Sequence, residues 1–372
     1  MEGLPTQARR IVVKLGTGVL TQGIGKLDTQ RIHDLCGQLA ALRRRGLEVV
    51  IVSSGAVGLG MGRLQLERRP KRLAALQKCA AVGQSILINT WQAGLDPHGL
   101  TAAQMLLTRE DVKSRTRHLA VKDLLGELLD SGLVPVVNGN DSVSTEEIKF
   151  GDNDVLSAMV ASLTHADLLA ILSTAPGLID REGSGEVVPL VETITPEIEA
   201  MAGGTADATA VGGMVTKIEA ARIATASGCG VFIGSGREPE VLQRIVEGPA
   251  PGTFFLPRKL PLDSRKRWIA FFQPPSGTLH VDAGAVQALQ EKGSSLLAKG
   301  IRSVDGHFGE EAVVEIAGPD RQAFARGISG FSSEDVSKIL GQGNDAIRAS
   351  FPRRKRCEVV HRDALVLLRD RA

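Results

Sequence analysis

Short, mostly apolar runs alternate along much of the chain with longer stretches in which apolar residues recur every three or four positions. The runs have the length of buried strands, and the stretches have the periodicity of helices that bury one face. Strands are predicted over residues 11–13, 47–52, 102–107, 133–137, 168–172 and 231–233, and helices over residues 28–45, 71–91, 121–129, 155–163 and 218–226. Because strands and helices alternate, the sequence predicts an α/β fold with a largely parallel central sheet, and the strand at 231–233 is expected to be its last.

The pattern changes near Gly252. Prolines punctuate the segment that follows, which also carries the basic run R-K-R-W at residues 265–268, and this composition is typical of a linker. Beyond it, residues 277–349 contain short alternating runs separated by glycine-rich turns, which predicts a small β-rich domain. We expect a large first domain over residues 1–258, a linker over 259–276, a β-rich domain over 277–355 and a C-terminal tail over 356–372.

Composition places the chain among ordinary globular proteins. It has 372 residues, 43% of them hydrophobic, and a formal net charge of +2, so total charge gives no argument for nucleic-acid binding. The four cysteines are far apart in the sequence, which disfavours a disulfide framework and a zinc site. Apolar runs fall short of the ~18 residues that span a bilayer, and the N-terminus lacks the pattern of a secretory signal. We therefore expect a cytoplasmic protein without a membrane partner.

Amide and carboxylate side chains gather after the strand predicted at residues 133–137. The sequence N-G-N-D occupies residues 138–141, and D-N-D occupies residues 152–154, just before an apolar, helix-like run. Ligands of open α/β sheets bind at the carboxyl ends of the strands, which makes this segment the candidate for the chemistry. Asn, Asp and Gly are also ordinary turn residues, so a plain loop is the alternative interpretation.

Two glycine-containing loops each carry a lysine. Lys14 ends the first predicted strand and is followed by Gly16, while Gly212 and Gly213 precede Lys217 at the start of a predicted helix. Glycine lets backbone amides approach a phosphate closely, and the N-terminus of a helix favours anions. These loops are therefore candidate phosphate sites. The alternatives are that Lys14 is merely solvated and that the second loop is a flexible glycine loop ahead of an ordinary surface helix. Lys217 is expected to be partly exposed.

Five motifs together resemble those of the glutamate 5-kinase family within the amino-acid kinase superfamily. They are V-V-K-L-G-T (12–17), I-V-S-S-G-A (51–56), V-N-G-N-D (137–141), I-K-F-G-D-N-D (148–154) and G-G-M-V-T-K (212–217). In addition, R-K-R-W (265–268) and G-S-S-L-L-A-K-G-I (293–301) are similar to the C-terminal PUA domain of that family. The motifs follow the order of the family over nearly the whole chain.

The resemblance implies both a fold and an activity. The fold is a three-layer α/β/α sandwich around a largely parallel sheet, followed by a PUA-like domain. The activity is transfer of a phosphoryl group from ATP to the γ-carboxylate of L-glutamate, which gives glutamyl 5-phosphate in the first step of proline biosynthesis. The resemblance also implies Mg²⁺ bound mainly through ATP, a homo-oligomer (dimer or tetramer), and feedback inhibition by proline.

Matching positions in the family's motifs give individual residues expected roles. Lys14 and Lys217 would bind the ATP phosphates, and Asp154 would orient both lysines. Glutamate would be held by Ser54, Asn138, Asp141 and Asn153. The expected ATP-binding residues are Lys14, Gly16, Ser173, Thr174, Val211, Gly212, Gly213, Met214, Val215, Thr216 and Lys217. Because a carboxylate is already a nucleophile, the chemistry requires positioning and charge neutralisation, with no general base.

The chain departs from the usual pattern of the family in three segments. Gly139 stands where a glutamate is common, and this departure bears on glutamate affinity and proline sensitivity. Ser173 and Thr174 stand where Thr-Asp is common, and Val211 gives the phosphate turn a stiffer, β-branched entry. We expect altered nucleotide affinity with the fold retained.

Two alternative functions stay open. A related kinase would act on acetylglutamate, aspartate, carbamate or a phosphorylated acceptor, but the paired N-x-N-D and G-D-N-D motifs and the C-terminal domain argue against it. The other alternative is a PUA-based RNA-binding protein with a degenerate kinase half. The two lysines and the near-neutral charge argue against that one, because binding to a phosphate backbone favours a basic face.

Overall fold

The chain forms two compact units, Met1–Pro261 and Leu262–Ala372. A computed structural model describes residues 8–23, 25–108, 110–111, 114–143, 152–203, 213–248, 250–259, 262, 264–352, 354 and 356–368. Within these residues, no helix combines the length and the apolar character needed to cross a membrane.

The first unit is built on an eight-stranded sheet with the strand order β5-β6-β4-β1-β7-β9-β10-β8. Its strands are β1 (Arg10–Leu15), β4 (Glu48–Ser53), β5 (Ala102–Leu107), β6 (Val134–Gly139), β7 (Leu168–Ser173), β8 (Leu190–Val191), β9 (Gly230–Ser235) and β10 (Thr253–Phe255). All neighbouring pairs are parallel except β9 and β10. The small hairpin β2 (Thr21–Gly23) and β3 (Lys26–Leu27) stands apart from this sheet. The expected parallel α/β fold is confirmed.

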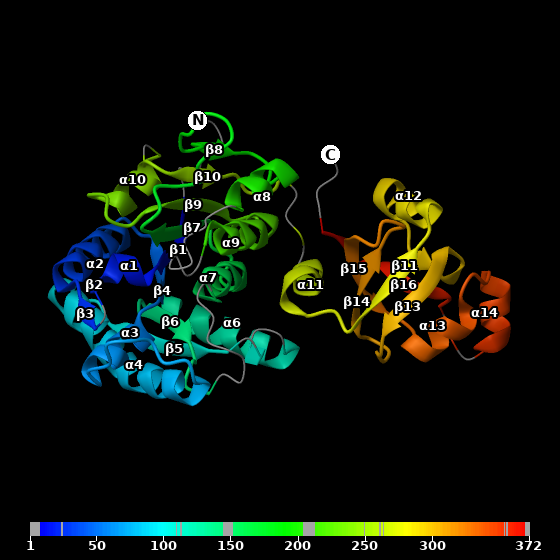
Figure 1. Cartoon of the computed structure of the whole chain (residues 1–372), viewed down its shortest axis with the longest axis horizontal. Helices are drawn as coiled ribbons and strands as arrows, with labels where there is room; N and C mark the ends of the chain where they lie inside the picture. Colours follow the sequence, from blue (N-terminus) through cyan, green and yellow to red (C-terminus); the bar gives the residue numbers. More distant parts are fainter. Residues whose placement is uncertain are drawn as a thin grey trace. The chain divides into compact units, whose positions relative to one another are not determined.

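Helices cover both faces of this sheet (Figure 1). They are α1 (Thr17–Leu20), α2 (Thr29–Arg44), α3 (Ala56–Arg63), α4 (Leu73–Leu95), α6 (Arg115–Asp130), α7 (Asp152–Leu163), α8 (Pro196–Ala202), α9 (Met214–Ala226) and α10 (Val241–Glu247), with a 3₁₀ turn at Asp96–His98. In Figure 1, α2 and α10 lie on one side of the central strands, and α7 and α9 lie on the other. The prediction that the strand at 231–233 is the last was wrong, because the short strand β10 follows it.

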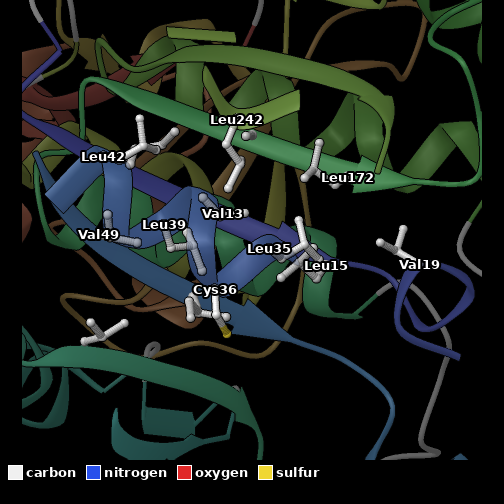
Figure 2. Packing of buried hydrophobic residues seen from close by; sticks show 14 of the residues in the cluster. Val13, Leu15, Val19, Leu35, Cys36, Leu39, Leu42, Val49, Leu172 and Leu242 are labelled. Carbon is white, nitrogen blue, oxygen red and sulfur yellow. The ribbon is translucent and has the colours of Figure 1, made fainter. Parts of the chain in front are cut away.

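Strand β1 shows how the sequence sorts side chains between the two layers. Successive side chains of a strand point to opposite faces. Val13 and Leu15 pack with Leu35 and Leu39 of α2 in the main hydrophobic core, where all four are fully buried. Figure 2 shows these side chains gathered between α2 and the sheet. Lys14, between Val13 and Leu15, therefore points to the opposite face, where α7 and α9 lie.

The second unit is a β-rich domain with helices at its edges. Its six strands have the order β12-β16-β15-β14-β11-β13 and comprise β11 (Gly277–Val281), β12 (Leu296–Leu297), β13 (Ile301–Gly306), β14 (Val313–Ala317), β15 (Ala323–Ser329) and β16 (Glu358–Leu367). The helices are α11 (Ser264–Arg267), a π-helical turn (Trp268–Phe272), α12 (Ala283–Lys292), a 3₁₀ turn (Ala298–Gly300), α13 (Ser333–Ile339) and α14 (Asn344–Ser350). The expected small β-rich domain is confirmed.

Two segments of this unit differ from their expected character. Ile269 and Ala270, placed in the linker by the sequence, are buried with Val313 and Val366 in a small hydrophobic cluster. Strand β16, placed in the C-terminal tail, pairs with both β12 and β15 inside the sheet. Polar residues in the middle of β16 interrupt its apolar alternation. The basic run at residues 351–356 precedes it, so the sequence pattern resembled that of a solvated tail.

Candidate active site

The polar side chains singled out in the sequence meet at the carboxyl edge of the first sheet. Strands β1, β4 and β6 end there, and helices α7 and α9 begin there. Helix α7 supplies two consecutive residues, Asn153 and Asp154, which contact different groups of side chains. The site therefore has two halves joined by one turn of α7.

The first half is a buried cluster of opposite charges around Asp154. The Lys14 Nζ atom lies 2.5 Å from Asp154 Oδ1, and the Lys217 Nζ atom lies 3.3 Å from Asp154 Oδ2. Thr216 Oγ1 donates to Asp154 Oδ2 over 2.8 Å. Asp154 is completely buried, and each lysine is 5% exposed. The structure thus brings together one residue from β1, one from α7 and two from α9.

The cluster was only partly anticipated. Lys217 lies in the first turn of α9, as expected, but the expectation that it is partly exposed is wrong, because it is buried. A lysine is disfavoured at that end of a helix, where the dipole is positive. The Asp154 carboxylate supplies the compensating charge, from a position 63 residues earlier in the chain.

Burial and mutual charge shift the pKa values of this cluster. Burial alone would raise the pKa of Asp154, but the charges of Lys14 and Lys217 and the hydrogen bonds from Lys14 and Thr216 hold it below its ordinary value of 3.8. Burial lowers the pKa of Lys217 below 10.5; Asp154 opposes this shift and Lys14 adds to it. Two lysines and one carboxylate give the cluster a net charge of +1 when all three groups are charged, and this excess positive charge can attract an anion.

The second half is a chain of amide side chains that ends at Ser54. Asn153 Nδ2 donates to Ser54 Oγ over 3.0 Å and to Asn138 Oδ1 over 2.9 Å. Asn138 Nδ2 donates in turn to Oε1 of Gln84, on α4, over 2.8 Å. The structure therefore joins three of the residues expected to hold glutamate and adds Gln84. A glutamine in the middle of a long helix carries no local signal, so the sequence did not reveal it.

Asp141 lies beside this chain, next to Gly139. A Cβ atom built on Gly139 would be 3.2 Å from Asp141 Oδ1 and 3.7 Å from Asn153 Oδ1. Both oxygens therefore lie on the side of Gly139 toward which a Cβ atom would project. The negative charge of Asp141 also reaches Arg69: burial lowers the pKa of Arg69, and Asp141 opposes that shift.

The glycine loop after β1 contacts the end of β7. Gly16 donates its backbone N–H to the carbonyl of Leu172 over 3.0 Å, and a Cβ atom at Gly18 would lie 2.8 Å from Thr174 Cγ2. Ser173 Oγ accepts from the backbone of Ala175 and Thr174 is exposed, so Thr174 is the more accessible of this pair.

The second glycine loop is described only from Gly213, the N-cap of α9. Met214 is half-buried, and Val215 is 58% exposed. Val211 and Gly212, which were also expected to bind ATP, lie outside the described residues. The other expected ATP-binding residues line the ends of β1 and β7 and the start of α9.

Comparisons with known proteins agree with this architecture. Residues 9–235 match the Amino acid kinase family, and residues 277–351 match the PUA domain. The glutamate 5-kinase of Trichlorobacter lovleyi is 45% identical over 370 residues, which cover 98% of each chain. That of Deinococcus radiodurans is 45% identical over 363 residues, which cover 96% of this chain and 100% of the relative. Among solved structures, carbamate kinase from Giardia lamblia bound to AMP-PNP has a TM-score of 0.49 at 16% identity, over 68% of this chain and 99% of that one.

The helix-covered parallel sheet and the match over residues 9–235 define an amino-acid kinase. Similarity over nearly the full length narrows this class. The protein belongs to the glutamate 5-kinase family, in which the kinase domain is followed by a PUA domain.

Proposed function

We propose that this protein phosphorylates the γ-carboxylate of L-glutamate with ATP, giving L-glutamyl 5-phosphate for proline biosynthesis. The carrying observation is the two-part site, in which Asn153 and Asp154 join an amide-rich half to a lysine-rich half. Membership of the glutamate 5-kinase family supports the same acceptor. A kinase with a carboxylate acceptor needs such an arrangement, because acceptor and donor are both anions that repel each other.

The acceptor half is suited to an amino-acid substrate. Ser54, Asn138 and Asn153 present hydrogen-bonding groups, and Asp141 adds a negative charge beside them. We assign the substrate ammonium to Asp141, because an ammonium group pairs most strongly with a carboxylate. This assignment leaves the γ-carboxylate to extend toward the lysines.

The donor half is suited to a triphosphate. Lys14 and Lys217 come from different elements, β1 and α9, and share one carboxylate, so both ammonium groups are held in place before ATP arrives. Fixed charges of this kind stabilise the transferring phosphoryl group without having to reorganise during the reaction. We assign Gly16, Thr174 and the start of α9, including Gly213 and Thr216, to the binding of the nucleotide phosphates.

The Mg²⁺ that the family implies would be held mainly through ATP. The Asp154 carboxylate is already paired with Lys14 and Lys217, although its buried Oδ1 accepts no hydrogen bond of regular geometry from the described residues. When bound, the ion supplies positive charge to the β- and γ-phosphates. Cytoplasmic localisation, assembly into a homo-oligomer and inhibition by proline are proposed with the activity, on the strength of the family alone.

The proposal is tested by ADP release with purified full-length protein. L-Glutamate, acetylglutamate, aspartate and carbamate are supplied in turn as acceptors. We expect turnover with L-glutamate to exceed the others, and the acyl phosphate to be trapped by hydroxylamine as the γ-hydroxamate. Lys217→Met serves as the inactive control, because it removes a proposed phosphate contact. Faster turnover with another acceptor would refute the proposal, and salt-sensitive RNA binding without any turnover would favour an RNA-binding role.

A further inference from the structure

Three amide side chains form a continuous hydrogen-bonded chain beneath the proposed glutamate site. It runs from Gln84 of α4 through Asn138 of β6 to Asn153 of α7, and it ends at Ser54. Each donor–acceptor distance lies between 2.8 and 3.0 Å. Asn138 is 3% exposed, so its amide has little access to water.

Backbone groups fix the direction in which the two asparagine amides point. The Gly139 N–H donates to Asn138 Oδ1 over 2.8 Å, so this oxygen cannot exchange places with Nδ2 without losing that bond. At the other end, Asn153 Nδ2 donates to the carbonyl of Ser53 over 3.3 Å. A backbone N–H only donates and a carbonyl only accepts. The chain therefore has one polarity, in which Gln84 Oε1 is the final acceptor.

This polarity decides what Asn153 presents to a ligand. With Nδ2 turned toward Asn138 and Ser54, its Oδ1 is left on the side of Gly139, where it has no hydrogen-bond donor among the described residues. Asp141 Oδ1 lies on the same side of Gly139. Two acceptor oxygens on one side of this glycine suit an ammonium group, which has donors only.

The same polarity makes Ser54 present a hydrogen-bond donor, where Asn153 presents an acceptor. Its Oγ atom accepts from Asn153, so its own hydrogen is directed elsewhere, and the described residues offer it no acceptor. A hydroxyl hydrogen in that position can donate to a carboxylate. Acceptors for an ammonium and a donor for a carboxylate lie side by side, as an α-amino acid requires.

We infer that Gln84 is a positioning residue that sets the hydrogen-bond polarity of the acceptor site and, through it, selects a substrate with an ammonium group. Gln84 accepts from Asn138 and acts through Asn138 and Asn153. Without its Oε1, the buried Nδ2 of Asn138 has no acceptor, and rotation of that amide relieves the loss at the expense of the bond to Asn153. This inference rests on the proposed function.

The test compares L-glutamate with glutarate, which has the same two carboxylates and no ammonium. Gln84→Met removes the acceptor at similar volume. We expect it to raise the glutamate KM about tenfold and to leave the inhibition constant of glutarate almost unchanged, so that discrimination falls by about the same factor. Gln84→Glu keeps an acceptor oxygen and is expected to retain the discrimination of the wild type. If Gln84→Met does not fold, Gln84→Asn, whose acceptor is too short to reach, takes its place.

Gln92→Met is the matched control on the same helix. Gln92 Oε1 accepts from the Ala102 N–H over 2.8 Å and takes no part in the amide chain. This variant is expected to lose stability without any change in discrimination. Equal losses for glutamate and glutarate in Gln84→Met would overturn the inference, as would failure of Gln84→Glu to restore discrimination. A wild-type protein that does not phosphorylate glutamate would instead refute the proposed function, and the inference with it.

Discussion

Removing Asp154 should cost more folding stability than removing Lys217, whereas removing Lys217 should abolish turnover at a smaller cost in stability. Asp154→Asn keeps the size of the side chain and removes the only negative charge from the Lys14, Asp154 and Lys217 cluster. The charge of the cluster rises from +1 to +2, and two buried ammonium groups then face each other without a counter-ion. Lys217→Met takes the charge from +1 to 0 and leaves Asp154 paired with Lys14 and Thr216.

The magnitudes follow from burial. Breaking a buried ion pair by removing one partner costs about 3–5 kcal/mol, because the remaining charge stays uncompensated. We expect Asp154→Asn to lose that amount, since its carboxylate is fully buried and joins two pairs of 2.5 and 3.3 Å. Lys217→Met removes a cation whose burial is unfavourable, and we expect it to lose under about 2 kcal/mol. Its turnover, in contrast, should fall below detection, since one of two phosphate contacts is gone.

Urea unfolding at pH 7 measures the free energy of unfolding of each variant, with Glu247→Gln as the control. Glu247 pairs with Arg45 over 3.2 Å, and the two side chains are 57% and 44% exposed. Removing such a surface pair costs under about 1 kcal/mol. If Asp154→Asn is no less stable than Glu247→Gln, or if Lys217→Met is the less stable of the two cluster variants, the charge argument is refuted.

Two further predictions concern pH and helix packing. Because burial lowers the pKa of Lys217, the protein should lose kcat/KM for ATP at a pH below the ordinary lysine value of 10.5, as that lysine loses its proton. Lys217→Arg should move this alkaline limit upward, because arginine keeps its charge, and an unmoved limit would assign the titration to another group. Gly83→Ala would place a Cβ 1.8 Å from the Ala56 carbonyl, so it should cost about 1–3 kcal/mol or more in urea unfolding as α3 and α4 are forced apart. Gly58→Ala, with nothing within 4 Å, should be neutral or stabilising; similar losses in both variants would contradict close packing as the cause.

The sequence predicted the central elements of the first unit because their patterns are long and regular. Strand β1 and helix α2 carry apolar residues at the spacing of a buried strand and of a one-faced helix, and both were placed correctly. Helix α3 was not predicted, because Ala56–Arg63 contains three glycines in eight residues. Its glycines allow backbone contact with α4: a Cβ at Gly60 would lie 1.8 Å from the Cys79 carbonyl. Such a helix is stabilised by its tertiary contact with α4, which the helix propensities of its own residues do not reveal.

The candidate site shows the same division between local and long-range information. The residues of N-G-N-D and D-N-D stand in motifs, so their gathering at one edge of the sheet could be expected from the strand that precedes them. The partner of Lys217 could not be read from periodicity, since Asp154 is 63 residues away. Gln84 was missed for the same reason, because its contact with Asn138 spans 54 residues and lies outside any motif.

The two halves of the site are coupled through the geometry of one helix. Successive residues of an α-helix project about 100° apart. At the start of α7, Asn153 therefore turns toward Ser54 and Asn138, while Asp154 turns toward Lys14 and Lys217. Asn153 and Asp154 are therefore displaced together by any shift of this turn. We therefore expect α7 to set the distance between a bound carboxylate and the transferring phosphate, although the residues of the site come from separate strands and helices.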